Sequence, residues 1–499
     1  MTVQKIQRLL IANRGEIACR IIKSAKEMGI QTIAVFSEAD RKAPHVFMAD
    51  EAVCIGPPAS SQSYLCQDKI LQVCQELEID AIHPGYGFLS ENAEFAKKVE
   101  AAGLIFVGPS ASAIETMGSK LAAKEAVKKY KIPLVPGTDF SIEDPALAKE
   151  KAREIGYPVL IKASAGGGGK GMRAVYSEEE LEEQMDRAMS EARSAFGNSS
   201  VFIEKYITSP KHIEVQVLGD KHGNIVHLFE RECSVQRRHQ KVIEEAPSTV
   251  ISPEMRQQMG DAAVGVAKAC QYVGAGTVEF IVDKELNFYF LEMNTRLQVE
   301  HPITEQITGK DLVKEQLRIA QGEKLPFTQA DLLINGHAIE VRIYAEDPHN
   351  NFLPDTGVLE VYKRPFGPGV RLDDGYEEGL EIPVFYDPMI AKLISFGKDR
   401  EEAIQRMLRA MEEYHITGVS TTMDFCKFVL QHEIFKNGSY DTNFVAEHFR
   451  PEMLQNGSQE DKWVAAALVH SFFQEQKSNH KPDALATKEQ KSKWKQRLK

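Results

Sequence analysis

The sequence predicts a multidomain protein of mixed α/β and α+β class, with a parallel sheet near its N-terminus and antiparallel hairpins further along. Three observations support this prediction. Apolar strands alternate with a helical pattern in the first hundred residues, two apolar strands flank a glycine run near residue 166, and a hairpin pattern follows at residues 275–301. With 499 residues, of which 43% are hydrophobic, the chain is long enough for about two to four compact domains.

The first hundred residues follow the pattern of a βαβ unit that further strands extend. Strands are expected at 9–12, 32–36, 81–83 and 104–107, and a helix at 16–28. We therefore expect a small parallel-sheet domain over residues 1–115. The turn from Asn13 to Glu16 contains one glycine, so it does not match the glycine-rich turn of dinucleotide-binding domains.

Composition and charge narrow the function classes. The 72 acidic residues outnumber the 60 lysines and arginines, and both signs are mixed along the chain, so we expect no nucleic-acid partner. No apolar stretch is long enough for a signal peptide or a bilayer span, so we expect no membrane association. The seven cysteines lie at positions 19, 54, 66, 74, 233, 270 and 426. They form no C-x-x-C pair, which predicts a reducing, cytoplasmic compartment.

A run of glycines between two apolar strands predicts a flap. A lysine-rich helical stretch at 120–131 is followed by a strand at 157–162, the glycines at 166–171, and a second strand at 172–176. A linker would have polar flanks. A P-loop would place Ser or Thr after its lysine and then a helix, whereas Gly171 follows Lys170 here. The remaining interpretation is a hairpin whose backbone amides can close over phosphates.

The hairpin pattern at residues 275–301 predicts two facing carboxylates. Its apolar strands flank a central polar stretch. With the turn centred between residues 285 and 286, Glu279 lies opposite Glu292, at a Cβ separation of about 5 Å. At an effective dielectric constant of about 20, two ionised carboxylates at that distance repel by about 3 kcal/mol, so a cation is expected between them. Carboxylate oxygens, with Asn294 nearby, suit a magnesium ion that shares nucleotide phosphates.

Two polar rows and a basic run add candidates for the same site. Alternation along an extended chain places each row on one face. The rows are Arg296, Gln298 and Glu300, and His212, Glu214 and Gln216. The run Gln236–Lys241 concentrates donors suited to anions, although a solvated surface loop explains such a run equally well.

The C-terminal third predicts an α+β domain and a distinct tail. Strands are expected at 357–362 and 390–396, and apolar spacing from Ala403 to Met411 predicts a helix. An apolar helical stretch at 463–473 precedes a tail at 481–499 with seven basic and two acidic residues. The tail is expected to be disordered, or alternatively to order on an acidic partner. Its candidate anchors are Trp463, Phe472, Phe473 and Trp494.

Several motifs together resemble the biotin carboxylase family of the ATP-grasp superfamily. They are ANRGEIACR, HPGYGFLSEN, KASAGGGGKGM, SVQRRHQKVIEEAPS, FLEMNTRLQVEHPITE, and a C-terminal segment with PDTG and YDPMIAKL. The resemblance covers roughly residues 4–450. It implies a Rossmann-like N-terminal domain (1–115), an ATP-grasp domain (116–335) with a glycine-rich flap in a flexible lid at 135–205, a C-terminal α+β biotin carboxylase domain (336–450), and a C-terminal helix and basic tail (451–499).

The resemblance also implies roles for individual residues. Those implied to hold ATP are Lys120, Lys162, Gly166, Gly167, Gly168, Gly169, Gly171, Met172, Glu204, Lys205, Ile207, His212, Gln236 and His239, with Glu204, Lys205 and Ile207 against the adenine. Those implied to hold magnesium, or manganese in its place, are Glu279, Glu292 and Asn294. Those implied for bicarbonate and carboxyphosphate are Lys241, Arg296, Gln298 and Val299, with Glu300 as the base and Arg342 as the cation beside the biotin enolate.

The implied function is ATP- and bicarbonate-dependent carboxylation of biotin through carboxyphosphate, the first half-reaction of an acyl-CoA carboxylase of acetyl-CoA or propionyl-CoA type. The implied partners are a biotin carboxyl carrier protein, a carboxyltransferase subunit and a second copy of the chain. None of the fifteen methionines is followed by lysine, the dipeptide that bears biotin in this family's carriers, so we expect biotin to arrive on a separate protein. Two alternatives stay open. An ATP-grasp ligase for another carboxylate would not need Glu300 with Arg342, and a regulatory subunit would bind ATP without turnover.

Overall fold

The computed structural model describes residues 3–164, 171–454 and 467–471. The chain divides into two compact units, Met1–Pro451 and Glu452–Lys499. In the second unit, residues 467–471 are helical, within the helix expected at 463–473, while the expected anchors and basic tail lie outside the described residues. Among the described residues, no helix combines the length and the apolar character needed to cross a membrane.

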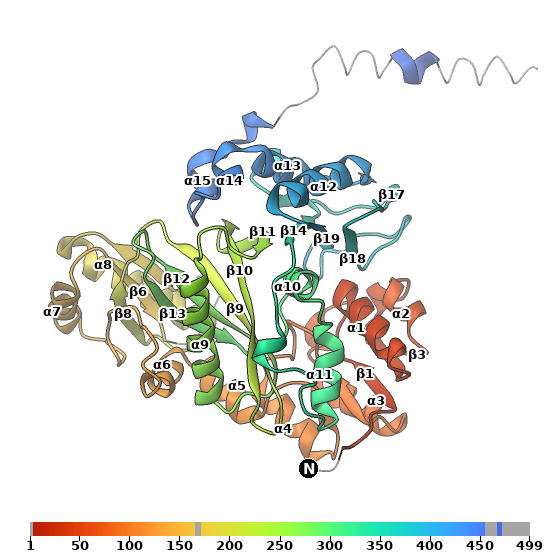
Figure 1. Ribbon diagram of the computed structural model, residues 1–499, viewed down its shortest axis with the longest axis horizontal. Helices are drawn as coiled ribbons and strands as arrows, with labels where there is room; N and C mark the ends of the chain where they lie inside the picture. The colour runs from red at the N-terminus through yellow and green to blue at the C-terminus, as the bar shows by residue number, and fades with distance from the viewer. Residues whose placement is uncertain (1–2, 165–170, 455–466, 472–499) are drawn as a thin grey trace, which may run out of the picture. The chain divides into compact units, whose positions relative to one another are not determined.

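The N-terminal part contains a parallel sheet of five strands in the order β3-β2-β1-β4-β5 (Figure 1). The strands are β1 (Arg8–Ile11), β2 (Gln31–Ser37), β3 (Glu51–Gly56), β4 (Ala81–His83) and β5 (Ile105–Phe106). The helices are α1 (Gly15–Glu27), α2 (Pro44–Met48), α3 (Gln67–Glu76), α4 (Ala93–Ala101) and α5 (Ala111–Gly118). The expected βαβ unit is confirmed as β1-α1-β2. The edge strand β3 was not expected, because most of its residues are only partly buried or exposed and leave no apolar run.

A separate antiparallel sheet in the order β7-β6-β8 carries the glycine hairpin. Its elements are β6 (Val159–Ala163), β7 (Met172–Val175), β8 (Val201–Lys205), α7 (Pro145–Ile155) and α8 (Glu178–Phe196). Lys162 pairs with Met172 across β6 and β7, which confirms the hairpin. Its loop, including Gly166–Gly169, lies outside the described residues. Apolar side chains of both helices and all three strands form one buried cluster, so this part has its own core.

The largest sheet is antiparallel, with eight strands in the order β13-β12-β9-β10-β11-β14-β19-β18. The strands are β9 (Lys211–Gly219), β10 (Ile225–Arg237), β11 (Gln240–Ala246), β12 (Gly274–Val282), β13 (Phe288–Asn294), β14 (His337–Tyr344), β18 (Val370–Asp374) and β19 (Met389–Gly397). Because β14 pairs with β11, the sheet continues across the expected domain limit at residue 335. Residues on either side of that limit can therefore share one site.

Helices pack on the large sheet, and short strands form separate pairs. The helices are α6 (Lys120–Lys128), α9 (Pro253–Ala269), α10 (His301–Thr308), α11 (Leu312–Ala320), α12 (Arg400–Glu413), α13 (Met423–Gln431), α14 (Glu433–Lys436) and α15 (Phe444–His448). The short strands are β15 (Glu346–Asp347), β16 (Leu353–Pro354), β17 (Val361–Lys363) and β20 (His415–Thr417). The strand and helix expected at 390–396 and 403–411 are confirmed as β19 and α12, whereas the strand expected at 357–362 is reduced to β17.

Candidate active site

One cavity of about 970 Å³ brings the predicted site residues together. The predicted residues that line it are Lys120, Lys162, Met172, Glu204, Lys205, Ile207, His212, Gln236, His239, Lys241, Glu279, Glu292, Asn294, Arg296, Gln298, Val299, Glu300 and Arg342. Gly171 was also predicted but is not among the lining residues. Its φ is +70°, and a Cβ there would lie 2.9 Å from the Cβ of Ala163, so glycine at this position allows the hairpin to close.

Strand β9 separates the core from the site by simple alternation. Its apolar residues at 213, 215 and 217 join the buried cluster that includes α9, where each such side chain contributes about 1.5–3 kcal/mol. His212, Glu214 and Gln216 lie on the opposite face. There, His212 lines the cavity, and Glu214 and Gln216 bind the buried side chain of Arg231. The shared polar face expected for this strand is thereby confirmed.

Three lysines gather at one end of the cavity around Glu204. Lys120 and Lys124 lie one turn apart on α6, and Lys162 lies on β6. The Nζ of Lys162 is 2.7 Å from Oε2 of Glu204, and Lys124 also pairs with Glu204. Although burial raises it, these two lysines hold the pKa of Glu204 below its usual range. The neighbourhood of Lys124, and the engagement of Glu204 by lysines, were not predicted.

Burial and like charge make the lysine cluster receptive to an anion. The pKa of Lys120 is lowered first by burial and then by the ammonium groups of Lys162 and Lys124, against the opposing effect of Glu292 and Glu204. A phosphate beside these groups would favour their charged forms. The cluster therefore suits nucleotide phosphates, as the sequence implied.

The facing carboxylates of the hairpin are confirmed, through a geometry that differs from the expected one. Glu279 pairs with Glu292 across β12 and β13. Nearer the turn, however, Phe280 pairs with Phe290, so the hairpin is centred on Glu285 and a register shift follows between Glu279 and Phe280. A regular hairpin with this centre would place Leu291 opposite Glu279. The bulge restores the pairing of the two glutamates, as bulges near sites often re-aim a side chain.

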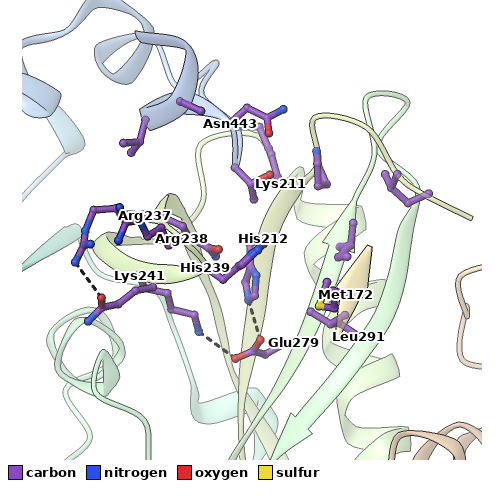
Figure 2. Close-up of a pocket in the computed structure, with 18 of the residues that line it drawn as sticks. Met172, Lys211, His212, Arg237, Arg238, His239, Lys241, Glu279, Leu291 and Asn443 are labelled. Carbon is purple, nitrogen blue, oxygen red and sulfur yellow. Dashed lines mark hydrogen bonds and ion pairs between the residues drawn. The ribbon is translucent and has the colours of Figure 1, made fainter. Parts of the chain in front are cut away.

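Glu279 is surrounded by donors. Its Oε1 accepts hydrogen bonds from Lys241 at 3.0 Å, Asn294 at 2.7 Å and Gln298 at 2.8 Å. Nε2 of His212 lies 2.9 Å from its Oε2, and Figure 2 shows His212 and Lys241 both directed at this carboxylate. Despite burial, Lys241 and His212 hold the pKa of Glu279 well below its usual range.

The residues present fit a divalent cation. Burial and the negative charge of Glu279 raise the pKa of Glu292, so this pair repels and would be stabilised by a cation placed between its members. Side-chain ligand atoms of His212, Glu214 and Glu279 also lie within 4.8 Å of one another. An all-oxygen set from Glu279, Glu292 and Asn294 is the kind that magnesium prefers.

Lys241 connects the carboxylates of the site. Its Nζ lies 2.5 Å from Oε2 of Glu214, 3.0 Å from Oε1 of Glu279 and 2.7 Å from Oε1 of Glu300. Arg231 holds Glu214 from the other side at 2.5 Å and is fully buried. Sequence reasoning singled out Lys241 but missed Arg231, whose role depends on pairing between β9 and β10 rather than on any local motif.

Glu300 lies between two cations. Besides Lys241, Nη2 of Arg342 donates to its Oε2 at 3.0 Å. Burial would raise the pKa of Glu300, but Lys241, Arg342 and Arg231 hold it well below its usual range. Glu300 is therefore ionised at neutral pH, as a base must be.

The segment from Arg296 to Glu300 does not form the extended chain that was expected. Residues 295–296 form a bend and residues 299–300 a turn that leads into α10. The three polar side chains of the expected row nevertheless line the same cavity. A turn brings them together because α10 begins at His301 and redirects the chain.

Glu91 orients Arg296 and was not predicted. Its Oε2 accepts from Nε of Arg296 at 2.8 Å, and its Oε1 accepts from the backbone amide of Thr295 at 3.0 Å. Glu91 belongs to the motif HPGYGFLSEN, which was noticed without a role for this residue. The motif therefore contained the available signal.

The segment 442–451 also lines the cavity and was not predicted. Its Thr442 amide donates to the carbonyl of Pro210 at 3.0 Å, and Asn443 donates to the hydroxyl of Ser209. Figure 2 places Asn443 near Lys211, at the rim of the pocket. No local pattern in this segment pointed to the site, because its position depends on packing between distant parts of the chain.

Together, the lysine cluster, the paired carboxylates and the glycine hairpin beside an antiparallel sheet define an ATP-dependent ligase of the ATP-grasp class. The chain matches the family described as "Biotin carboxylase, N-terminal domain" over residues 5–114, "Carbamoyl-phosphate synthase L chain, ATP binding domain" over 119–328, and "Biotin carboxylase C-terminal domain" over 340–447. The chain belongs to the biotin carboxylase family, whose enzymes carboxylate biotin at the expense of ATP.

Individual relatives agree with this assignment. The chain is 54% identical to Biotin carboxylase 1 of Bacillus subtilis over 441 residues, covering 88% of this chain and 98% of the relative. It is 52% identical to rat methylcrotonoyl-CoA carboxylase subunit alpha but spans only 62% of that protein's length. The biotin carboxylase domain dimer of 2-oxoglutarate carboxylase from Hydrogenobacter thermophilus, solved with MgADP, ADP and bicarbonate, matches with 48% identity and a TM-score of 0.87, covering 91% of this chain and all of that one.

Proposed function

We propose that this chain activates bicarbonate with ATP as carboxyphosphate and transfers the carboxyl group to biotin held by a carrier protein. The observation that carries the proposal is Glu300, ionised between Lys241 and Arg342, in the same cavity as the Glu279–Glu292 pair. Bicarbonate needs a base before it can attack a phosphate as a dianion. A ligase for another carboxylate has no such need, because its substrate is already ionised and has no proton to lose.

We assign the nucleotide to one end of the cavity. Lys120 and Lys162 bind its phosphates, with the glycines at 166–169 and 171 as the flap above them. The residues assigned to the rest of the nucleotide are Met172, Glu204, Lys205, Ile207, His212, Gln236 and His239. Glu279, Glu292 and Asn294 would hold magnesium, or manganese in its place. When bound, the ion neutralises phosphate charge during transfer.

The bicarbonate half of the site contributes charge and orientation. Lys241 and Arg296 attract the anion, and Gln298 and Val299 line its position. Glu300 accepts the bicarbonate proton, and the resulting carbonate oxygen attacks the γ-phosphorus while ADP departs. The surrounding side chains exclude bulk water, which limits hydrolysis of carboxyphosphate.

Arg342 serves the biotin half of the reaction. Carboxyphosphate breaks down to carbon dioxide and phosphate, and the phosphate accepts the proton from N1 of biotin. Negative charge then develops on the ureido oxygen, and a fixed guanidinium stabilises it better than a mobile lysine would. N1 attacks carbon dioxide to give carboxybiotin.

We further propose the setting in which the enzyme works. The reaction is the first half of an acyl-CoA carboxylase of acetyl-CoA or propionyl-CoA type, with a carrier protein and a carboxyltransferase as partners, a dimer of this chain, and a cytoplasmic location. The 50% identity with pig propionyl-CoA carboxylase alpha chain supports the acyl-CoA assignment. The dimer in the 2-oxoglutarate carboxylase structure supports the second. The free state of all seven cysteines supports a reducing compartment. We place the domain limits at 115, 335 and 450.

Phosphate release from ATP tests the proposed function. Purified chain is expected to hydrolyse ATP only when magnesium and bicarbonate are both present, because the site contains no other nucleophile activated by Glu300. Free biotin is expected to increase the rate, because breakdown of carboxyphosphate is then coupled to transfer. Equal phosphate release in carbonate-free buffer would contradict the proposal.

A further inference from the structure

Two buried carboxyl groups face each other directly behind Arg342. Glu244 on β11 pairs with Glu340 on β14 in the antiparallel register. Glu244 is 1% exposed and Glu340 is not exposed. Among the described residues, no donor makes a hydrogen bond to any of their four carboxyl oxygens. Such groups are rare in a folded protein and call for an explanation.

Arg342 links this pair to Glu300. Its Nε lies 2.7 Å from Oε1 of Glu244, and its Nη2 lies 3.0 Å from Oε2 of Glu300. Two ion pairs at different nitrogens of a planar guanidinium fix the rotation of that plane. Glu244 therefore holds Arg342 from the side opposite to Glu300.

The carboxyl pair cannot be fully ionised. Residues directly opposite in an antiparallel pair have Cβ atoms about 5 Å apart, and two buried carboxylates sharing one site compete for a single negative charge. Burial raises the pKa of Glu244 to about 7, with Glu300 and Glu214 adding to the rise and Arg342 and Lys241 opposing it. Burial and Glu244 raise the pKa of Glu340 well above its usual range. At neutral pH the proton therefore belongs to Glu340.

The charged and titratable groups around the pair come from several elements. They are Arg342, Lys392, Glu300, Lys241, Glu214, Cys233 and Cys426. Lys392 is the cation that acts on Glu340, and its Nζ also donates to the carbonyl of Val299 at 2.8 Å. Arg342 is thus the cation through which Glu244 reaches the cavity.

We propose that Glu244 and Glu340 are positioning residues that share one proton and that ionised Glu244 holds Arg342 in the orientation needed for biotin carboxylation. The inference rests on the proposed role of Arg342. When Glu244 is ionised, Arg342 is fixed at two nitrogens. When Glu244 gains a proton, that anchor is lost and Arg342 is held through Glu300 alone. Since Glu244 is ionised above its pKa, the biotin-dependent step gains activity as pH rises through about 7.

The test compares biotin carboxylation with biotin-independent, bicarbonate-dependent ATP cleavage in the same preparation across pH. The ratio of the two rates removes effects that pH exerts on bicarbonate itself. In Glu244→Gln we expect a roughly hundredfold fall in kcat for biotin carboxylation, as for a misplaced catalytic group, with a much smaller change in ATP cleavage. The acid limb of the ratio near pH 7 should disappear, and Glu244→Asp should restore part of the rate.

Glu340→Gln distinguishes positioning from a general structural effect. It keeps the ion pair between Glu244 and Arg342 and removes the competing carboxylate, so the acid limb should move to lower pH by about one unit or more. Glu245→Gln is the matched control. Glu245 is equally buried and adjacent, but it binds His337, Arg400 and Tyr440, so its loss should leave the limb in place.

Each failure is distinguishable. A wild-type chain without bicarbonate-dependent ATP cleavage would overturn the proposed function itself. An active wild type whose ratio profile is unchanged in both Glu244→Gln and Glu340→Gln would overturn the positioning role alone. A limb that stays in place in Glu340→Gln while Glu244→Gln loses activity would reject the shared proton.

Discussion

Glu300→Gln is expected to lower bicarbonate-dependent ATP cleavage by about 10²- to 10⁴-fold, the range that general-base catalysis contributes. The amide keeps the size of the side chain but cannot accept the bicarbonate proton. Because Lys241, Arg342 and Arg231 keep the pKa of Glu300 low, raising the pH cannot replace the missing base. The measurement is kcat for phosphate release at saturating bicarbonate.

Glu232→Gln provides the control for this substitution. Glu232 is also buried, but it accepts hydrogen bonds from Ser234 and Ser248 and does not line the cavity. Its variant should retain most of the ATP cleavage, which separates loss of the base from loss of a buried carboxylate. A Glu300→Gln enzyme that cleaves ATP at the wild-type rate would refute the assignment of the base.

Arg342→Ser is expected to reduce biotin carboxylation by about 10²- to 10³-fold, the effect of removing one electrostatic stabiliser of a transition state. Bicarbonate-dependent ATP cleavage should fall far less, because Lys241 still holds Glu300 at 2.7 Å. Both rates are measured on one preparation, with carboxybiotin and phosphate as products.

Arg342→Lys separates charge from shape. Lysine keeps a positive charge but lacks the planar group that reaches Glu300 and Glu244 together, so its rate of biotin carboxylation should lie between those of the serine variant and the wild type. If Arg342→Ser loses both activities equally, Arg342 is not specific to the biotin step.

The elements closest to the chemistry were the ones most predictable from sequence. Alternation along β9 and the pairing of Glu279 with Glu292 follow from local periodicity. The expected centre of that hairpin was wrong, because a bulge near Glu279 cannot be seen in an alternating pattern. Two departures compensated each other, so the predicted pair was correct.

The residues that orient the site were not predictable in the same way. Glu91 reaches Arg296 across about two hundred positions, and Glu244 reaches Arg342 only because β11 pairs with β14. Both glutamates lie within motifs that were noticed. Their partners, however, depend on strand pairing and turns between distant segments, which local patterns do not encode.

Formation of carboxybiotin tests the central claim most directly. Purified chain, ATP, magnesium, isotopically labelled bicarbonate and free biotin are combined, and biotin is examined by mass spectrometry under alkaline conditions that preserve the carboxylated product. We expect biotin to gain one labelled carboxyl group, in an ATP-dependent manner, and Glu300→Gln to abolish the gain. ATP cleavage that is stimulated by bicarbonate but leaves biotin without label would contradict the assignment of this site to biotin carboxylation.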